Sequence, residues 1–170
     1  MIILVAGATH TGKTAYAQKL LEKYQYPYLS IDHLKMGLIR SGICPYTVYE
    51  DEKLTDYLWP IVREMVKTAI ENRQNLIVEG CYVPKDWIDD FDKEYLKEIR
   101  FVCLAMSDAY IDSHFEEIIK HCSDVESRLY DSDLDISYLK RENRRYISSF
   151  ADQVILIEND YLSTIESLLT

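Results

Sequence analysis

The residues best suited to chemistry stand at the start of the chain, where residues 7–14 read GATHTGKT. This stretch matches G-x-x-x-x-G-K-[ST], follows an apolar run and leads into a helical pattern, the context expected of a phosphate-binding loop. Gly7 and Gly12 allow backbone conformations and close approaches that a Cβ atom would block. Successive backbone N–H groups can then form an anion-binding nest at the positive end of the helix. The sequence therefore predicts a site for a nucleoside triphosphate.

The two polar residues that close this loop have separate expected roles. Lys13 can bridge the outer phosphates, and the hydroxyl of Thr14 can hold Mg²⁺. His10 lies where the backbone makes the contacts, so we interpret its side chain as a spacer. The alternative, a chance match in a tight turn, is disfavoured by the flanking strand and helix. The expected nucleotide-binding residues are Gly7, Ala8, Thr9, His10, Thr11, Gly12, Lys13 and Thr14.

The elements that must position this loop alternate between short apolar strands and amphipathic helices. Strands are expected at 1–6, 27–31, 75–78, 99–105 and 154–157, and helices at 13–24, 33–41, 52–72, 84–92, 108–121, 136–151 and 161–169. Pro60 is expected to bend or divide the longest helix. This alternation predicts one α/β domain over residues 1–170, with a parallel sheet covered on both faces. Ligands of such sheets bind beyond the carboxyl ends of the strands, so residues just after each strand are the candidates.

Carboxylates follow the second and third expected strands, at Asp32 and Glu79. Near a triphosphate and its metal, one carboxylate can accept the proton of an attacking hydroxyl. The other can hold Mg²⁺ through water or grip the acceptor. The alternatives are a helix N-cap for Asp32, which is compatible with catalysis, and a solvated loop carboxylate for Glu79. The apolar run before Glu79 favours its burial at the edge of the sheet.

Arginines gather in residues 141–145, which read RENRR. On a helix, Arg141, Arg144 and Arg145 lie within one arc, opposite an apolar stripe. Guanidinium groups fit phosphoryl oxygens, and a cation there stabilises the transition state of phosphoryl transfer. Residues 123–145 would then form a lid that excludes water. The alternative is a solvated face that balances the nearby Asp131, Asp133 and Asp135.

Three residues of the helix expected after the second strand could contact the acceptor. Lys35 and Arg40 could grip an anionic acceptor, and His33 lies directly beside Asp32. Plain surface positions are the alternative for all three. The acceptor-binding segment is expected to cover residues 33–60.

The composition excludes some classes of partner. The net charge of −10, from 19 basic and 29 acidic residues, disfavours nucleic acid or an anionic bilayer as a bulk partner. It leaves room for a small anionic substrate. A signal peptide at the amino terminus would remove the phosphate loop, and no apolar stretch is long enough to span a membrane. The four cysteines are scattered without metal-ligand spacing, which indicates reduced thiols. We therefore expect a cytoplasmic protein.

The quoted residues resemble the adenylate-kinase-like branch of P-loop kinases, and within it small-molecule kinases of the zeta-toxin and chloramphenicol-phosphotransferase type. The matching features are the GATHTGKT loop, Asp32, the Glu79-Gly80 pair and the arginine-bearing helix before the fifth strand. The resemblance implies a five-stranded parallel sheet in the order 2-3-1-4-5, a mobile lid and a helical acceptor-binding segment. It also implies that Asp32 is the catalytic base and that Asn159, in the turn after the fifth strand, lies near the adenine.

One departure from that branch bears on the acceptor. Nucleoside monophosphate kinases carry a D-G-F-P-R run after the third strand, whereas residues 79–84 read EGCYVP and contain no arginine. A nucleotide acceptor is therefore disfavoured.

The sequence thus predicts an ATP- and Mg²⁺-dependent kinase that transfers the γ-phosphoryl group to a small-molecule acceptor, through a hydroxyl. The catalytic candidates are Lys13, Asp32, Arg141, Arg144 and Arg145. The candidates for substrate binding are Asp32, His33, Lys35, Arg40 and Glu79, and those for the metal are Thr14 and Glu79. Two alternatives stay open: a nucleoside monophosphate kinase, and an ATP-binding switch or regulatory module without an acceptor.

Overall fold

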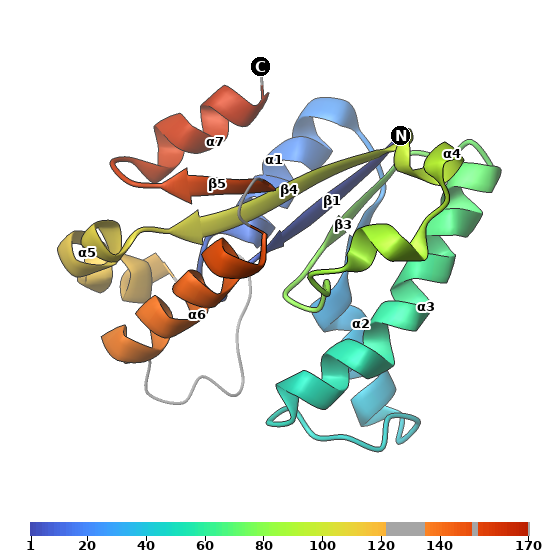
Figure 1. Cartoon of the computed structure of the whole chain (residues 1–170), viewed down its shortest axis with the longest axis horizontal. Helices are drawn as coiled ribbons and strands as arrows, with labels where there is room; N and C mark the ends of the chain where they lie inside the picture. The colour runs from blue at the N-terminus through green and yellow to red at the C-terminus, as the bar shows by residue number, and fades with distance from the viewer. Residues whose placement is uncertain (122–134, 151–152, 170) are drawn as a thin grey trace.

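The structure is a computed structural model that describes residues 1–121, 135–150 and 153–169. Its sheet contains five parallel strands in the order β2-β3-β1-β4-β5 (Figure 1). The strands are β1 (Ile2–Gly7), β2 (Tyr28–Ser30), β3 (Leu76–Glu79), β4 (Ile99–Met106) and β5 (Val154–Ile157). The predicted fold class and strand order are confirmed.

The helices follow the predicted pattern with one change. They are α1 (Lys13–Tyr24), α2 (Ile31–Arg40), α3 (Asp51–Glu71), α4 (Lys93–Leu96), α5 (Asp108–His121), α6 (Ile136–Ser149) and α7 (Tyr161–Leu169). The single helix predicted at 84–92 is wrong: a 3₁₀ turn, η1 (Trp87–Asp90), and the short α4 take its place. The N–H of Trp87 donates to Pro84 O at 3.2 Å, so Pro84 begins a turn rather than a helix. Pro60 lies inside α3 without dividing it.

The central strand β1 divides the core into two layers because its side chains alternate between the faces of the sheet. Ile3 and Val5 pack with buried residues of α1 and α7. Ile2 and Leu4 pack on the other face, in a cluster that includes buried residues of α3 and α6. Every residue of β1 is buried, as expected for the middle of a covered parallel sheet. The loop after β1 therefore starts from the buried centre of the sheet. None of the helices among the described residues combines the length and the apolar character needed to cross a membrane.

The junction between β2 and α2 differs from the expectation for Asp32. The strand ends at Ser30, and the helix begins at Ile31. Ser30 is the N-cap residue, because its Oγ accepts a hydrogen bond from the N–H of His33 at 3.4 Å. Asp32 lies inside the first turn of the helix, so its interpretation as the N-cap is wrong. Its carboxylate still lies at the positive end of the helix.

A substitution of Gly7 tests the close approach between the end of β1 and the neighbouring strand β4 at the phosphate loop. Gly7 has φ +147°, and a Cβ atom there would lie 2.2 Å from Leu104 O of the neighbouring strand. We expect Gly7→Ala to lower the free energy of unfolding by about 3 kcal/mol or more, measured by urea denaturation. Gly37→Ala is the matched control, because this position in α2 has no atom within 4 Å of the new Cβ. It should raise stability by about 0.5–1 kcal/mol. Equal stabilities of the two variants would contradict the close approach.

Candidate active site

The phosphate loop folds around its own backbone. Gly12, the N-cap of α1, has φ +75°, and His10 has φ +63°. The Ala8 carbonyl accepts hydrogen bonds from Thr11 Oγ1 at 2.8 Å and from Lys13 Nζ at 2.7 Å. Lys13 is only 4% exposed. The loop thus presents a buried cation and the start of a helix at one place, which suits the binding of an anion.

A tyrosine from the end of the chain supports this loop. Tyr161, the first residue of α7, donates its hydroxyl hydrogen to Gly12 O at 2.8 Å. Its ring fills the space beside Gly12, where a Cβ atom would lie 2.5 Å from the ring. Burial raises the pKa of the Tyr161 hydroxyl, so the group remains a neutral donor. The turn after β5 is therefore attached directly to the phosphate loop.

Glu79, the last residue of β3, is buried beside the loop. It is 1% exposed, which confirms the predicted burial. Its Oε1 accepts from Thr14 Oγ1 at 3.4 Å, and its Oε2 accepts from the hydroxyl of Tyr28 at 2.9 Å. Tyr28 lies on the edge strand β2. Two hydrogen bonds from different elements thus fix the direction of this carboxylate.

The pair formed by Thr14 and Glu79 fits Mg²⁺. A hydroxyl and a carboxylate are the hard oxygen ligands that this ion takes, usually together with substrate phosphates. Over the described residues, no group of three or more His, Cys, Asp or Glu side chains is arranged to hold a metal by itself. A metal here would therefore depend on phosphate oxygens for further ligands.

Asp32 lies in the first turn of α2, directly after β2, and is paired with Lys35. The Lys35 ammonium is 2.5 Å from Asp32 Oδ1 and donates to the hydroxyl of Tyr82 at 2.9 Å. Lys35 thus contacts the predicted base directly. His33 and Arg40 are exposed on the same helix. Their role in binding an acceptor remains a prediction.

Cys81 lies where these groups converge. Burial raises the pKa of its thiol, while the Lys13 ammonium acts in the opposite direction, and Asp32 and Glu79 add to the increase. The thiol therefore stays protonated and is no nucleophile at neutral pH. Ser30 and Glu79 are paired across β2 and β3, and Glu79 bonds to Thr14 of the phosphate loop. Asp32 and Cys81 each follow that pair by two residues, so they lie at the same edge of the sheet as the loop, a region that we call the convergence point.

Helix α6 contacts this point through Tyr146, whose hydroxyl donates to Cys81 O at 2.5 Å. The predicted apolar stripe of α6 is confirmed, since Leu139, Tyr146 and Phe150 are all buried. Asn143 is also fully buried: its Oδ1 accepts from the N–H of Met106, and its Nδ2 donates to Leu139 O. These contacts fix how α6 is rotated over the end of β4.

The three arginines of α6 have different surroundings. Arg144 forms an ion pair with Asp108 of α5 and lowers the pKa of that carboxyl through their hydrogen bond. Arg141 lies 5.3 Å from the ring centre of Tyr138. Arg145 lies 5.6 Å from the ring centre of Tyr146, whose hydroxyl contacts Cys81 O, and it forms an ion pair with Glu142 at 3.3 Å. Arg145 is thus associated with the convergence point, while Arg144 is held by α5.

Other predicted elements lie at the margin of the described residues or outside them. Asn159 is exposed in the turn after β5, and its proximity to adenine stays a prediction. Of the predicted lid at 123–145, only residues 135–145 are described, and Asp131 and Asp133 lie outside the described residues.

Several contacts of the site were missed by the sequence analysis. They come from tyrosine hydroxyls of β2, the segment after β3, α6 and α7: Tyr28, Tyr82, Tyr146 and Tyr161. The available signal was the high tyrosine content, 14 of 170 residues. It could not indicate which hydroxyls face the site.

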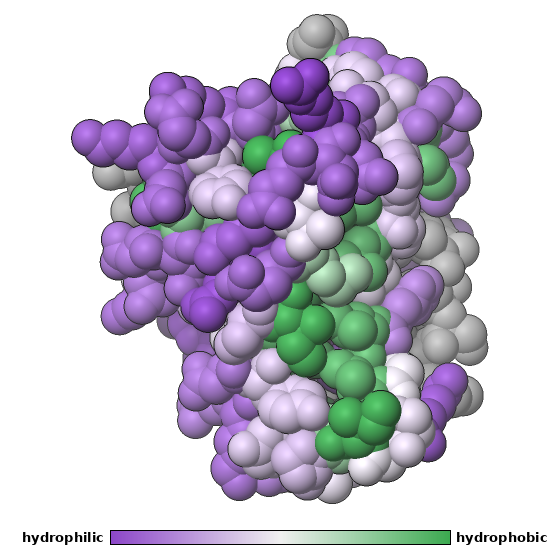
Figure 2. Space-filling view, turned by 90° about the vertical axis from the view of Figure 1, so that its right-hand side faces the viewer, coloured by the Kyte–Doolittle hydropathy of each residue, from purple (hydrophilic) through white to green (hydrophobic). Residues whose placement is uncertain are grey.

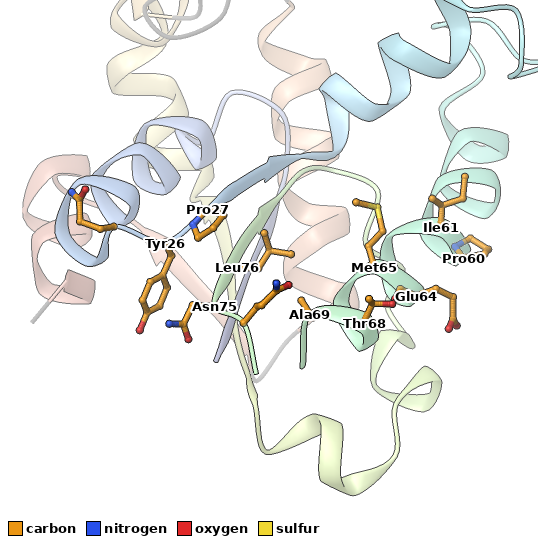
Figure 3. A pocket seen from close by; sticks show the side chains of 12 residues that line it. Tyr26, Pro27, Pro60, Ile61, Glu64, Met65, Thr68, Ala69, Asn75 and Leu76 are labelled. Atoms are coloured by element: carbon orange, nitrogen blue, oxygen red, sulfur yellow. The ribbon is translucent and has the colours of Figure 1, made fainter. Parts of the chain in front are cut away.

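A separate groove of about 900 Å³ lies at the opposite, amino ends of β2 and β3. Figure 3 shows its two walls, with Tyr26, Pro27, Asn75 and Leu76 on one side and residues of α3 on the other. Ile61 and Met65 of α3 are exposed apolar residues of its lining. Figure 2 faces the side on which α3 lies in Figure 1 and shows an apolar band there. Because it is at the wrong end of the strands for the phosphate loop, this groove is not the phosphate site.

Comparison with known proteins assigns the family. The model of the family described as Zeta toxin matches residues 1–106, which include the phosphate loop, Asp32 and Glu79. The chain belongs to the Zeta toxin family. No curated protein sequence matches it significantly.

Solved structures extend the likeness of this Zeta toxin family member to the whole fold. A gluconokinase from Sinorhizobium meliloti 1021 has a TM-score of 0.55 and 16% identity, covering 98% of this chain and 88% of that one. A shikimate kinase from Bacteroides thetaiotaomicron has a TM-score of 0.58 and 15% identity, covering 99% and 96%. A deoxyadenosine kinase from M. mycoides has a TM-score of 0.51 and 13% identity, covering 99% and 97%. At these identities the likeness shows the shared fold alone.

The hydrogen bond from Tyr28 to Glu79 can be tested by stability. Tyr28→Phe removes a donor from a buried carboxylate, so we expect the free energy of unfolding to fall by about 1.5–3 kcal/mol in urea denaturation. The control is Tyr26→Phe, whose ring stacks on Tyr24 with centroids 5.5 Å apart. It should change stability by less than about 0.5 kcal/mol. Equal effects of the two variants would show that the hydroxyl of Tyr28 does not support Glu79.

Proposed function

We propose that this chain is an ATP- and Mg²⁺-dependent phosphotransferase that moves the γ-phosphoryl group of ATP to a hydroxyl of a small molecule. The observation that carries the proposal is that the buried Lys13 lies in the phosphate loop whose Thr14 bonds to Glu79, and that Glu79 pairs across the sheet with Ser30, two residues before Asp32. These groups provide a cation for the outer phosphates, a carboxylate for the metal and a carboxylate for the acceptor. The names of the gluconokinase and the shikimate kinases that share the fold support a small-molecule acceptor.

In the proposed reaction the acceptor oxygen attacks the γ-phosphorus, and the proton of that hydroxyl passes to Asp32. The bond between the γ-phosphorus and the β–γ bridging oxygen breaks, and ADP leaves. Lys13 and the N–H groups of the loop hold the phosphates throughout. Mg²⁺, held by Thr14 and Glu79, would neutralise phosphate charge. Guanidinium groups of α6 stabilise the charge that develops on the transferred group.

A panel of acceptors separates this proposal from its alternatives. Sugars, sugar acids and amino-alcohols are tested with ATP and Mg²⁺ beside AMP, CMP and UMP. A phosphorylated sugar or alcohol supports the proposal, and transfer confined to the nucleotides indicates a nucleoside monophosphate kinase. Stoichiometric ATP binding without any phosphorylated product indicates a switch or regulatory module.

Lys13→Ala tests the function itself. Removing the ammonium deprives the outer phosphates of their cation, so we expect turnover to fall by a factor of about 10³ or more. The circular dichroism spectrum should remain that of the wild type. The control is Lys23→Ala, an exposed position at the end of the same helix, which should retain wild-type turnover. Full activity of Lys13→Ala would overturn the proposal.

The arginines of α6 provide a second test. Because the Arg145 guanidinium lies 5.6 Å from the ring centre of Tyr146, whose hydroxyl contacts Cys81 O, we propose that it stabilises the transferring phosphoryl group. Arg145→Ala should lower kcat by about 10²- to 10³-fold. Arg144→Ala removes a cation held by Asp108 and should give the smaller loss. A larger loss of kcat for Arg144→Ala would assign the role to that residue instead.

A further inference from the structure

Lys35 of α2 is confined by three contacts, one with Asp32 of the same helix and two with Tyr82 of the segment after β3. Its side chain is only 14% exposed. Its ammonium bonds to Asp32 Oδ1 and to the hydroxyl of Tyr82, and it lies 5.0 Å from the centre of the Tyr82 ring. Tyr82 is itself only 5% exposed, so its ring is a fixed wall. A flexible lysine side chain is thus held in one orientation.

We infer that Lys35 is a positioning residue that orients the carboxylate of Asp32 toward the acceptor. The inference rests on the proposed function, in which Asp32 receives the proton of the acceptor. Lys35 contacts only Oδ1, and among the described residues no other side chain or N–H is hydrogen-bonded to the Asp32 carboxylate. The second oxygen, Oδ2, therefore remains to receive the proton, while the first is held in place.

This role differs from gripping an anionic acceptor, which the sequence analysis considered for Lys35. To bind an anionic acceptor, the Lys35 ammonium would have to break its hydrogen bond to Asp32, because its observed contacts are with that carboxylate and with Tyr82. Positioning uses the observed contacts unchanged. It also connects α2 with the segment after β3, so that Asp32 and Glu79 keep a constant separation.

The surface offers a matched control for this pair. Lys97 bonds to Glu94 at 2.7 Å with the same spacing of three residues, but these side chains are 67% and 82% exposed. An exposed pair of this kind contributes little to stability. Lys97→Met therefore reproduces the chemical change of Lys35→Met at a position outside the site.

The experiment compares Lys35→Met, Lys35→Arg, Tyr82→Phe and Lys97→Met in the full chain, with Asp32→Asn and Lys13→Ala as reference variants. The reaction is followed as ATP hydrolysis, with water as the acceptor, and with the acceptor that the panel identifies. We expect Lys35→Met to lower kcat by about 10- to 100-fold, because a small misplacement of a catalytic group has effects of this size. The KM values for ATP and acceptor should stay within about threefold. Lys35→Arg should recover part of kcat, and Tyr82→Phe should lie between Lys35→Met and the wild type.

A purely structural role for Lys35 predicts a different result, namely a lower melting temperature with a normal kcat for the folded fraction. A raised KM for the acceptor with unchanged kcat would show that Lys35 grips the acceptor, and would overturn the inference. Turnover of Lys35→Met equal to that of Lys97→Met would overturn it as well. If Lys13→Ala is inactive in that case, the proposed function stands and only the role of Lys35 fails. If Lys13→Ala and Asp32→Asn are both fully active, the proposed function fails first.

Discussion

The ammonium group of Lys13 is buried at the base of the phosphate loop. The arrangement of the site depends on the hydrogen bonds and opposite charges that compensate this buried cation. A buried charge is costly by several kcal/mol unless it is paired and hydrogen-bonded. Ala8 O accepts a hydrogen bond from this ammonium, and the buried carboxylate of Glu79 bonds to the adjacent Thr14. These partners come from the ends of different strands, so the register of the parallel sheet decides whether the charge is satisfied. An incoming phosphate would add a further anionic partner.

Tyrosine hydroxyls hold the backbone and carboxylates of this site without adding charge. Tyr146 and Tyr161 bond to the carbonyls of Cys81 and Gly12, and burial raises the pKa of both hydroxyls. Tyr28 bonds to the carboxylate of Glu79. A neutral donor can be buried with one good hydrogen bond, whereas a lysine there would bring its own charge to be satisfied.

Local signals predicted the parts of the site that lie close together in the sequence. The phosphate loop could be found because its glycines, lysine and threonine fall within eight residues, between an apolar strand and an amphipathic helix. The position of Glu79 at the end of a buried strand followed from the apolar run before it. The strand order came from the resemblance to P-loop kinases, since periodicity alone cannot order parallel strands.

The remaining features depend on contacts between distant segments. Tyr28 and Glu79 are 51 residues apart, and Tyr146 and Cys81 are 65 residues apart. Composition does not pair such residues. The surroundings of Arg144 differ from those of Arg145 because Arg144 is paired with Asp108 in a neighbouring helix. A helical projection of α6 alone cannot show this partner. Ser30 and Asp32 are both residue types that cap helices, and they lie only two positions apart. Ser30 is the N-cap because β2 ends there and α2 begins at the next residue.

The bond from Tyr161 to Gly12 has a consequence for how the protein is made. These residues are separated by 149 positions, so at a synthesis rate of roughly 5–20 residues per second the loop waits about 7–30 s for this support on the ribosome. During that interval the nascent chain carries the amino-terminal motif without the ring that fills the space beside Gly12. Nucleotide capture in its final geometry therefore requires that α7 has been synthesised and has docked against the beginning of the chain.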